Sequence, residues 1–505
     1  MNASRAEAWE RLGGQRFDLL VIGAGIVGAR IAFEAARAGM SVALVDAGDF
    51  GGATSSASSK LIHGGFRYLA MGDLHLVWES QCERRALMGR IAPHLVRRLP
   101  MVLAAYRGGP TGPITAAAGV LAYGALCGFR GTGVSLVQAR AAQRLVPSLR
   151  TERLSVCGVF DEGQTNDARL VLDTVGAAAG LGATVLNYAR VVALDRQHGR
   201  LASASILGLD GEGIVETEFR YVINASGPWV DKVRLMEDAV GPPMARLSKG
   251  IHVLLEPQSK WRAGVVVPLE GGRVTMALPW QGMLMLGTTD ADYEGDPADC
   301  AASPAEVRQV LAEASLALPP EVTRAEAVRF TFAGLRVLPL GTGSSASSHR
   351  EHVVRTGRFG MVSIAGGKLT THRRIALEAL HRLPEPRLAD LHLVDIPLPQ
   401  ASRLLLAEAE GDAEPDVVAH LVQVYGRVAL SVMRQRHRHR DAFERIHPAG
   451  PDVWAQVYHA SEEERAVTVE DVMRRRTTVA VRGLATPGVR ARVGRILAST
   501  PSAGT

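Results

Sequence analysis

A glycine-rich turn near the start of the chain constrains the fold most. Residues 18–22 form a short aliphatic run that leads into GAGIVG at residues 23–28, and residues 26–38 have the apolar spacing of a helix. A second apolar run, residues 41–45, closes with Asp46, about 20 residues beyond the glycines. Strand, glycine turn, helix, strand and acid in this order predict a dinucleotide-binding βαβ unit.

Each glycine of the turn has its own predicted task. Gly23 permits the tight turn, Gly25 lets the backbone approach a pyrophosphate, and Gly28 lets the helix pack close to the strand. The free N–H groups at the start of the helix favour an anion without the help of a lysine. Asp46 is then expected to accept a hydrogen bond from a ribose hydroxyl.

A hydroxyl-rich segment after the second strand indicates which dinucleotide binds. Residues 54–69 read TSSASSKLIHGGFRYL and combine hydroxyls, a cation and two adjacent glycines. An extended FAD needs hydroxyl and backbone donors along its pyrophosphate and ribityl chain, whereas a nicotinamide enzyme has no evident use for them here. The sequence therefore favours FAD over a nicotinamide cofactor.

The segment resembles the FAD-dependent glycerol-3-phosphate dehydrogenases of the quinone-linked respiratory type, in which TSSxSSKLIHGGxRYL is characteristic. Four shorter matches follow, namely NASGPW at residues 224–229, GTTD at 287–290, GLR at 334–336 and GGKLTT at 366–371. Two departures are mild, since Asp46 stands where the family often has Glu and His372 where it often has Tyr. Either acid accepts a hydrogen bond from ribose, so the expected cofactor does not change.

The expected FAD contacts come from the glycine turn, the acid, the hydroxyl-rich segment, the turn at residues 224–227 and a last glycine turn at residues 366–367. Pattern and resemblance together imply Gly23, Gly25, Gly28, Asp46, Thr54, Ser55, Ser56, Ser58, Ser59, Lys60, Leu61, His63, Gly64, Gly65, Ala225, Gly227, Gly366, Gly367, Lys368, Leu369 and Thr370. A helix is expected over residues 368–381, with its start near the flavin pyrimidine edge. We expect one tightly held, non-covalent FAD.

The resemblance also implies a reaction, the oxidation of sn-glycerol 3-phosphate to dihydroxyacetone phosphate with hydride transfer to flavin N5. Arg336 sits in apolar company and needs an anionic partner, and with Lys368 it would stabilise a developing alkoxide. His252 is the favoured general base because imidazole titrates near neutrality, with His63 as the second choice. The predicted catalytic residues are thus Arg336, Lys368, His252 and His63, and the predicted substrate-binding residues are Arg67, Tyr68, Arg336, Arg350 and Lys368.

The rest of the chain predicts an α/β fold, α+β overall, with three parts. Residues 190–194, 202–209 and 219–223 indicate a small antiparallel set. Short alternating runs between about residues 242 and 336, including 251–255, 264–268, 274–278 and 283–287, indicate a β-rich layer. His252, Arg329 and Arg336 could point inward from this layer. Residues 382–399 are rich in proline and indicate a linker. We expect a Rossmann-like FAD-binding domain over residues 16–75, 150–235 and 337–385, a substrate-binding domain over 76–149 and 236–336, and a C-terminal helical cap over 400–505.

Composition limits the partners. Lys and Arg number 57 against 51 Asp and Glu, and a net charge of +6 suits an anionic substrate or an acidic membrane surface. No nucleic-acid motif accompanies this charge. The four cysteines lack metal-ligand spacing, which predicts reduced thiols and no metal site. Residues 1–14 lack the apolar core of a secretory signal, so a cytoplasmic location is expected.

Attachment to a membrane is expected from one side only. Residues 114–129 carry no charge but are fewer than the roughly 20 needed to span a bilayer. Arg434, Arg436, Arg438 and Arg440 alternate with other residues and could meet anionic headgroups on the inner face of the cell membrane. A membrane quinone is the expected electron acceptor. An oxidase that uses oxygen shares every motif, a non-catalytic flavin scaffold would have lost the interior cations, and a homodimer stays open.

Overall fold

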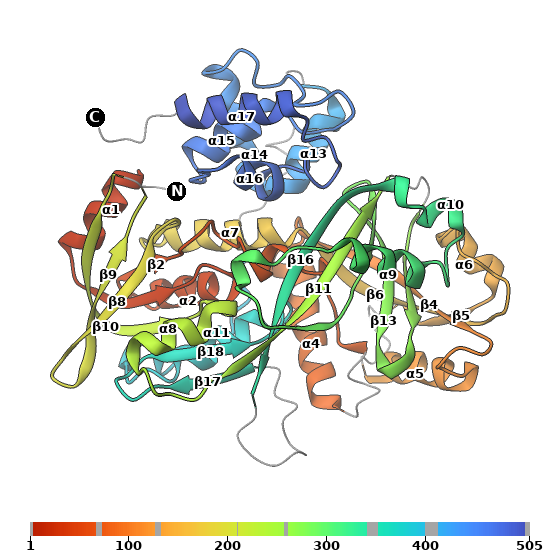
Figure 1. Cartoon of the computed structure of the whole chain (residues 1–505), viewed down its shortest axis with the longest axis horizontal. Coiled ribbons are helices and arrows are strands. Elements are labelled where there is room, and N and C mark those ends of the chain that lie inside the picture. Colours follow the sequence, from red (N-terminus) through yellow and green to blue (C-terminus); the bar gives the residue numbers. More distant parts are fainter. Residues whose placement is uncertain are drawn as a thin grey trace.

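The computed structural model describes residues 4–66, 73–126, 133–209, 211–256, 261–340, 352–398 and 413–499. Two sheets lie side by side, and a group of helices from the C-terminal part of the chain lies above them (Figure 1). The expected fold class is confirmed, and the three-part arrangement is the observed one. The domain boundaries themselves stay predictions.

The predicted βαβ unit forms the centre of the first sheet. The strand order is β17-β18-β10-β1-β2-β7, and β1 pairs in parallel with both β2 and β10. Because parallel strands end at the same edge, the glycine turn and Asp46 lie side by side. The strands are β1 (Phe17–Ile22), β2 (Val42–Val45), β7 (Thr184–Leu186), β8 (Arg190–Gln197), β9 (Arg200–Leu207), β10 (Ile214–Asn224), β17 (His352–Thr356) and β18 (Val362–Gly366).

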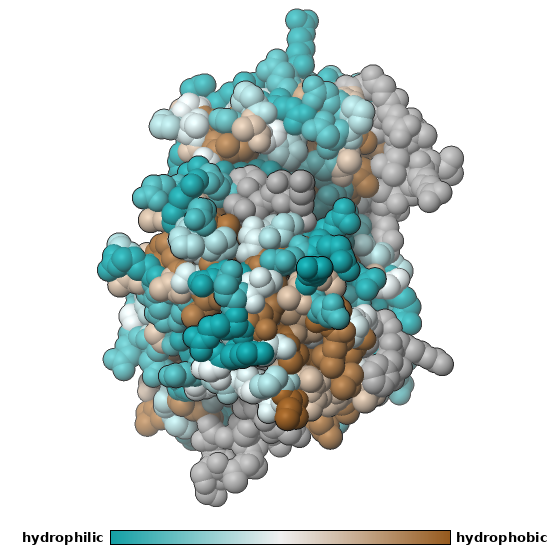
Figure 2. All heavy atoms as spheres, turned by 90° about the vertical axis from the view of Figure 1, so that its right-hand side faces the viewer, coloured by the Kyte–Doolittle hydropathy of each residue, from teal (hydrophilic) through white to brown (hydrophobic). Residues whose placement is uncertain are grey.

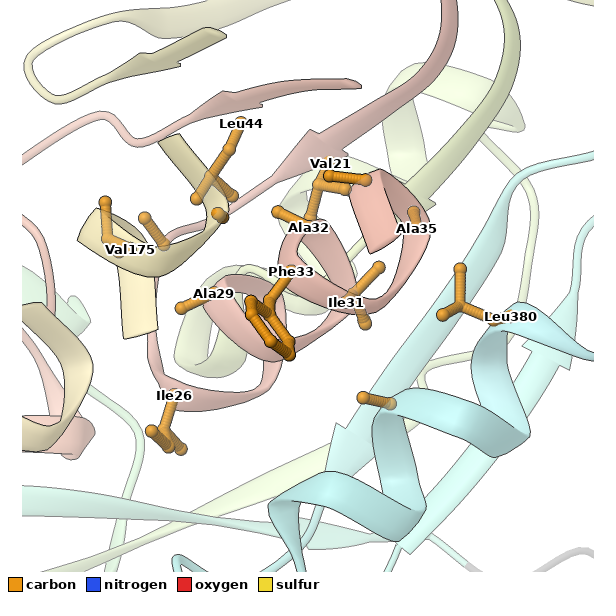
Figure 3. Close-up of a cluster of buried hydrophobic side chains, with 14 of the residues drawn as sticks. Val21, Ile26, Ala29, Ile31, Ala32, Phe33, Ala35, Leu44, Val175 and Leu380 are labelled. Atoms are coloured by element: carbon orange, nitrogen blue, oxygen red, sulfur yellow. The ribbon is translucent and has the colours of Figure 1, made fainter. Parts of the chain in front are cut away.

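Helix α2 (Ile26–Arg37) lies between α7 (Asp167–Gly180) and α11 (His372–Leu380) beneath this sheet. Figure 3 shows Ala29, Ala32 and Phe33 of α2 between Val175 of α7 and Leu380 of α11. The small alanines let the helices approach closely while Phe33 fills the space between them. This packing fixes the position of α2, and with it the first residues of the helix, which belong to the glycine turn.

The second sheet confirms the predicted β-rich layer. Its order is β15-β11-β14-β13-β12-β4-β6-β3, with β16 paired to β11 and β5 to β6. The strands are β3 (Leu61–Ile62), β4 (Val96–Tyr106), β5 (Ser135–Val137), β6 (Leu154–Thr165), β11 (Ala245–Leu255), β12 (Gly264–Pro268), β13 (Val274–Trp280), β14 (Met283–Gly287), β15 (Ala291–Tyr293) and β16 (Val328–Pro339). Because β3 belongs to the hydroxyl-rich segment, that segment joins the two sheets.

The remaining helices cover the sheets and form the C-terminal part. They are α1 (Arg5–Gly14), α4 (Leu74–Ala86), α5 (Pro113–Leu126), α6 (Ala139–Leu145), α8 (Val230–Glu237), α9 (Pro304–Ala314), α10 (Pro320–Thr323), α13 (Pro415–Tyr425), α14 (Ala429–Arg434), α15 (Trp454–Glu462), α16 (Val469–Asp471) and α17 (Pro487–Ser499). The last five lie above α7 in Figure 1. No helix within the described ranges is long and apolar enough to cross a membrane.

Three local predictions are corrected. Residues 219–223, expected in an antiparallel set, pair in parallel with β1, although β8 and β9 are antiparallel as expected. The helix expected from residue 368 begins at His372, since two left-handed glycines and a turn precede it. The expected linker is packed over its described part, where Leu383, Leu388, Leu391 and Leu398 are buried in the core around α2.

Candidate functional site

The glycine turn leaves no room for side chains. Gly23 has a φ of +102°, and a Cβ there would lie 2.6 Å from the Ala225 carbonyl oxygen. A Cβ on Gly28 would lie 1.9 Å from the Gly23 carbonyl oxygen, and one on Gly25 would lie 3.0 Å from Ser55 Oγ. The three positions thus form a cradle that tolerates no larger residue than glycine, as expected of a turn that lets the backbone approach a pyrophosphate.

The turn after β2 folds back onto this cradle. Asp46 accepts hydrogen bonds from the Ala24 and Gly48 N–H groups at 2.6 and 2.9 Å. Burial raises the pKa of its carboxyl to about 6, although these N–H donors favour the ionised form. Ser55 Oγ accepts from the Ile26 N–H at 3.0 Å, at the start of α2. Acid and hydroxyl therefore lie where the ribose and pyrophosphate of a dinucleotide would need them.

The next part of the hydroxyl-rich segment is held by protein groups. Ser58 Oγ donates to Asp167 Oδ2 at 2.7 Å, and Lys60 Nζ donates to Asp167 Oδ1 at 2.8 Å and to the Ser56 carbonyl oxygen at 2.6 Å. The buried Lys60 ammonium also lies 4.9 Å from the centre of the Phe332 ring. The Ser58 and Lys60 side chains therefore anchor the segment to α7, and the N–H groups of both residues are also hydrogen-bonded within the protein. Their predicted contacts with the cofactor stay predictions.

Distant motifs meet at His63 and Gly64. Thr370 Oγ1, from the last glycine turn, donates to the His63 carbonyl oxygen at 3.3 Å. The Gly64 N–H donates to Glu162 Oε2 at 2.8 Å, and a Cβ on Gly64 would lie 2.0 Å from Gln81 Nε2. The structure thus brings the GGKLTT and KLIHGG motifs together, 307 residues apart along the chain. Two motifs that are both predicted to contact FAD therefore lie side by side.

His252 is buried and neutral. Its Nε2 lies 2.9 Å from Ser59 Oγ, and its ring stacks on Phe332 at 4.9 Å. Burial, together with the charges of Lys60 and Arg336, lowers its pKa to about 3. The expectation that it titrates near neutrality is therefore wrong for the protein without substrate. A neutral imidazole has a free lone pair, but a lowered pKa makes it a weaker base, and its role as general base stays a prediction.

Arg336 has the anionic partner that its surroundings required. Its Nη1 lies 3.2 Å from Asp290 Oδ1, and its Nη2 donates to Thr288 Oγ1 and the Thr289 carbonyl oxygen at 3.0 Å each. The side chain is 36 % exposed, so solvent reaches part of it. Asp290 was not among the predicted residues, although it closes the GTTD motif. Arg329 instead pairs with Glu256 on the surface, outside this site.

Four predicted substrate-binding residues remain. Arg67, Tyr68 and Arg350 lie outside the described residues. Lys368 is half-buried in the turn between β18 and α11. Among the described residues, no group of His, Cys, Asp and Glu side chains could hold a metal ion.

A backbone cradle at the carboxyl ends of parallel strands, beside a second sheet that carries His252 and Arg336, is the arrangement expected of an FAD-dependent oxidoreductase. Residues 18–373 match the family described as FAD dependent oxidoreductase, and residues 364–501 match the C-terminal domain of alpha-glycerophosphate oxidase. The chain belongs to the FAD-dependent glycerol-3-phosphate dehydrogenase family, and its cofactor is FAD.

Individual relatives are similar over most of the chain. Glycerol-3-phosphate dehydrogenase 2 of Mycobacterium tuberculosis is 32 % identical over 493 residues, which cover 95 % of this chain and 84 % of the relative. The enzyme of Synechocystis is 33 % identical over 500 residues, covering 92 % and 89 %. The crystal structure of the Bacillus halodurans glycerol-3-phosphate dehydrogenase with FAD superposes with a TM-score of 0.74 at 25 % identity, covering 98 % and 96 %.

Proposed function

We propose that the protein oxidises sn-glycerol 3-phosphate to dihydroxyacetone phosphate and passes the electrons to a membrane quinone. Bound FAD accepts the two electrons of the oxidation. The observation that carries the substrate assignment is Arg336, whose partly exposed guanidinium is held in place by Asp290, Thr288 and Thr289. Such a held fork suits an anionic oxygen, whether on the phosphate or on the reacting hydroxyl.

Arg336, Lys368 and His252 have different roles in the proposed reaction. Arg336 and Lys368 bind the anionic substrate and stabilise negative charge on the hydroxyl oxygen as its proton leaves. His252 accepts that proton. Burial is the largest cause of the low pKa of His252, followed by the charges of Lys60 and Arg336. A bound phosphate dianion would offset the contribution of the charges and so raise the pKa of the imidazole in part.

The surface of α5 supports a lipid-dissolved acceptor. None of the exposed residues of α5 is charged, and the apolar ones include Ile114, Ala118, Leu121, Ala122 and Ala125, of which Ile114 is 84 % exposed. Leu74 and Trp78 are exposed on α4, which packs against α5. Figure 2 faces this side of the molecule and shows hydrophobic atoms gathered on its lower part. We call these seven residues the α4–α5 surface and propose that it rests on the membrane interface.

The inner side of α5 reaches the substrate segment. Tyr123 of α5 packs edge to face on Phe66 at 5.4 Å, and Phe66 directly precedes the predicted phosphate ligand Arg67. Tyr123 OH also donates to Glu162, which holds the Gly64 N–H. Helix α5 alone thus separates the α4–α5 surface from Phe66, the residue before Arg67. This short separation favours a quinone over a water-soluble acceptor.

The basic run that starts at Arg434 does not belong to this surface. It lies in the C-terminal part, at the opposite end of the molecule from α5 (Figure 1). Arg438 and His439 of the run contact Glu462 at 2.9 and 3.1 Å, so part of the charge is balanced within the protein. One flat membrane could not meet both regions, and the proposal retains the α4–α5 surface.

Flotation with liposomes tests the membrane part of the proposal. Ile114→Glu places a charge on the α4–α5 surface, and Ile214→Glu is the matched control because Ile214 is 64 % exposed on β10. Ile114→Glu should lose co-flotation and slow quinone reduction, while the control should behave as wild type. Wild-type protein that stays at the bottom of the gradient at low and high salt, yet turns over briskly with oxygen, would favour the oxidase.

An anaerobic titration tests the reaction itself. Glycerol 3-phosphate should bleach the flavin absorbance, and glycerol should not, because only the phosphate meets the cations of the site. Quinone added afterwards should restore the colour. A flavin that glycerol 3-phosphate leaves oxidised would favour the non-catalytic scaffold.

A further inference from the structure

Two arginines from the C-terminal part, Arg475 and Arg476, form ion pairs with Asp49 in the turn after β2. We call these ion pairs the grip. Asp49 accepts from Arg475 Nε at 2.5 Å and from Arg476 Nη2 at 2.8 Å, and these residues are 426 and 427 positions further along the chain. Arg476 Nη1 also contacts Asp49, and Asn187 Nδ2 donates to Asp49 Oδ1 at 3.1 Å. The side chains of Asp49 and Arg476 are 1 % and 0 % exposed. A buried charge of this kind persists only when it is paired.

The two arginines are themselves held firmly. Arg475 Nη2 donates to Asp471 Oδ1 at 2.5 Å, and Asp471 also accepts from the hydroxyl of Tyr188 at 2.8 Å. Arg476 Nη2 donates to the Glu464 carbonyl oxygen at 3.1 Å. The grip is therefore buried where the C-terminal part meets the turn after β2, and it is not one of the exposed ion pairs that contribute little to stability.

The gripped turn is the one that completes the FAD cradle. Asp46 accepts from the Ala24 N–H, the Gly51 N–H donates to the Ala24 carbonyl oxygen at 3.0 Å, and Ser55 accepts from the start of α2. Asp49 lies between these contacts in the sequence. We propose that Arg475 and Arg476 are positioning residues for FAD, which hold the turn so that Asp46 meets the ribose hydroxyls. The C-terminal part of the chain then controls how tightly the cofactor is retained.

The grip also contributes to the pKa of Asp46. Burial is the largest cause of its raised pKa, the negative charge of Asp49 raises it further, and the positive charge of Arg475 lowers it. Tyr188, from the loop after β7, stays neutral because burial raises its pKa. Without an arginine, the charge of Asp49 is less well balanced and the pKa of Asp46 rises. Without the charge of Asp49, the pKa of Asp46 falls. Protonated Asp46 accepts less well from ribose, so FAD retention should follow this pKa.

The test measures FAD release from purified holoenzyme between pH 5 and 8, followed by the increase in flavin fluorescence after dilution. Arg476→Gln and Asp49→Asn should each weaken FAD binding at pH 7 by about tenfold or more, as removal of a residue that orients a ligand contact does elsewhere. The pH midpoint of release should move up for Arg476→Gln and down for Asp49→Asn. Opposite shifts separate positioning through Asp46 from general loss of structure, which would move both variants the same way.

Two further variants complete the design. Arg438→Gln removes an exposed arginine of the same C-terminal part, whose partner is Glu462, and should release FAD as wild type does. If Arg476→Gln does not fold, Arg475→Gln takes its place, with the same upward shift expected. Wild-type retention and midpoint in the arginine variants, or a shift of the same sign in Asp49→Asn, would overturn the proposal.

Discussion

The cofactor side of the site consists mainly of backbone atoms and short side chains, and the proposed substrate side consists of long charged side chains. On the cofactor side, the decisive groups are backbone atoms of Gly23 and Gly28 and the short side chains Asp46 and Ser55. On the proposed substrate side they are long side chains such as Arg336, which comes from a different sheet. Backbone N–H groups suit the pyrophosphate of FAD, whereas a small anionic alcohol is recognised by the charges of side chains placed to meet it.

This difference determines what each side tolerates. A backbone cradle fails when volume is added, because main-chain atoms cannot move aside without unpacking α2. A side-chain site fails when charge or geometry is changed, even if the fold is intact. Substitutions can therefore break one side and leave the other in place.

Gly28→Ala should have the largest effect. The new Cβ would lie 1.9 Å from the Gly23 carbonyl oxygen, so strand and helix must separate. We expect destabilisation by roughly 1–3 kcal/mol or more and loss of bound FAD. The measurement is the flavin-to-protein absorbance ratio of the purified protein, together with urea unfolding.

Gly176→Ala is the matched control, since it is the same change in helix α7. A Cβ there meets no atom within 4 Å, and alanine in a helix interior is more stable than glycine by about 1 kcal/mol. The control should keep its FAD and unfold at slightly higher urea. Equal flavin content in the two variants would contradict the account of the cradle.

Arg336→Lys should break the substrate side alone. An ammonium cannot reproduce the fork that contacts Thr288, Thr289 and Asp290 together. We expect kcat/KM for glycerol 3-phosphate to fall by about 10²–10³-fold at unchanged flavin content. Arg329→Lys, on the same strand, changes an arginine that pairs with Glu256 on the surface and should leave kcat/KM nearly as in wild type. Near-normal turnover by Arg336→Lys would remove Arg336 from the site.

The same contrast explains which parts of the structure could be predicted from the sequence. The cradle was predictable because its residues are neighbours in the chain and its spacing reflects one local geometry. Two strands of the second sheet, Gly264–Pro268 and Met283–Gly287, have their expected bounds. Helix α9 was missed inside the β-rich layer, although Ser303 and Glu306 form a capping box that marks its start.

Charge partners were the least predictable part. Two arginine-rich stretches of the C-terminal part look alike in the sequence, yet Arg434, Arg438 and Arg440 are exposed and Arg476 is fully buried. The difference lies in Asp49, whose position next to Arg476 follows only from the folded chain. Asp290 beside Arg336 is a similar case. Pairings across hundreds of residues leave no local pattern, so the sequence indicated that Arg336 needs an anion but not which residue supplies it.

The smallest effect concerns pH, which acts on side chains and not on a backbone cradle. Burial lowers the pKa of His372 to about 3, as it does for His252, from an ordinary value of 6.5. The unfolded chain binds a proton at each imidazole below pH 6.5 while the folded chain does not, so stability is lost as pH falls from 6.5 towards 3. The loss is roughly 2 kcal/mol for each imidazole at pH 5.

His372→Gln should remove one half of this loss. Glutamine can still donate to the Leu369 carbonyl oxygen, which lies 2.7 Å from His372 Nδ1, but it does not titrate. The free energy of unfolding in urea, measured at pH 7 and pH 5, should therefore differ by roughly 2 kcal/mol less in this variant than in wild type. His437→Gln changes an exposed histidine and should keep the wild-type difference. Asp46 contributes equally in all three proteins and cancels in the comparison. An unchanged difference in His372→Gln would mean that this imidazole is protonated in the folded protein, and the same doubt would then extend to neutral His252 as the base.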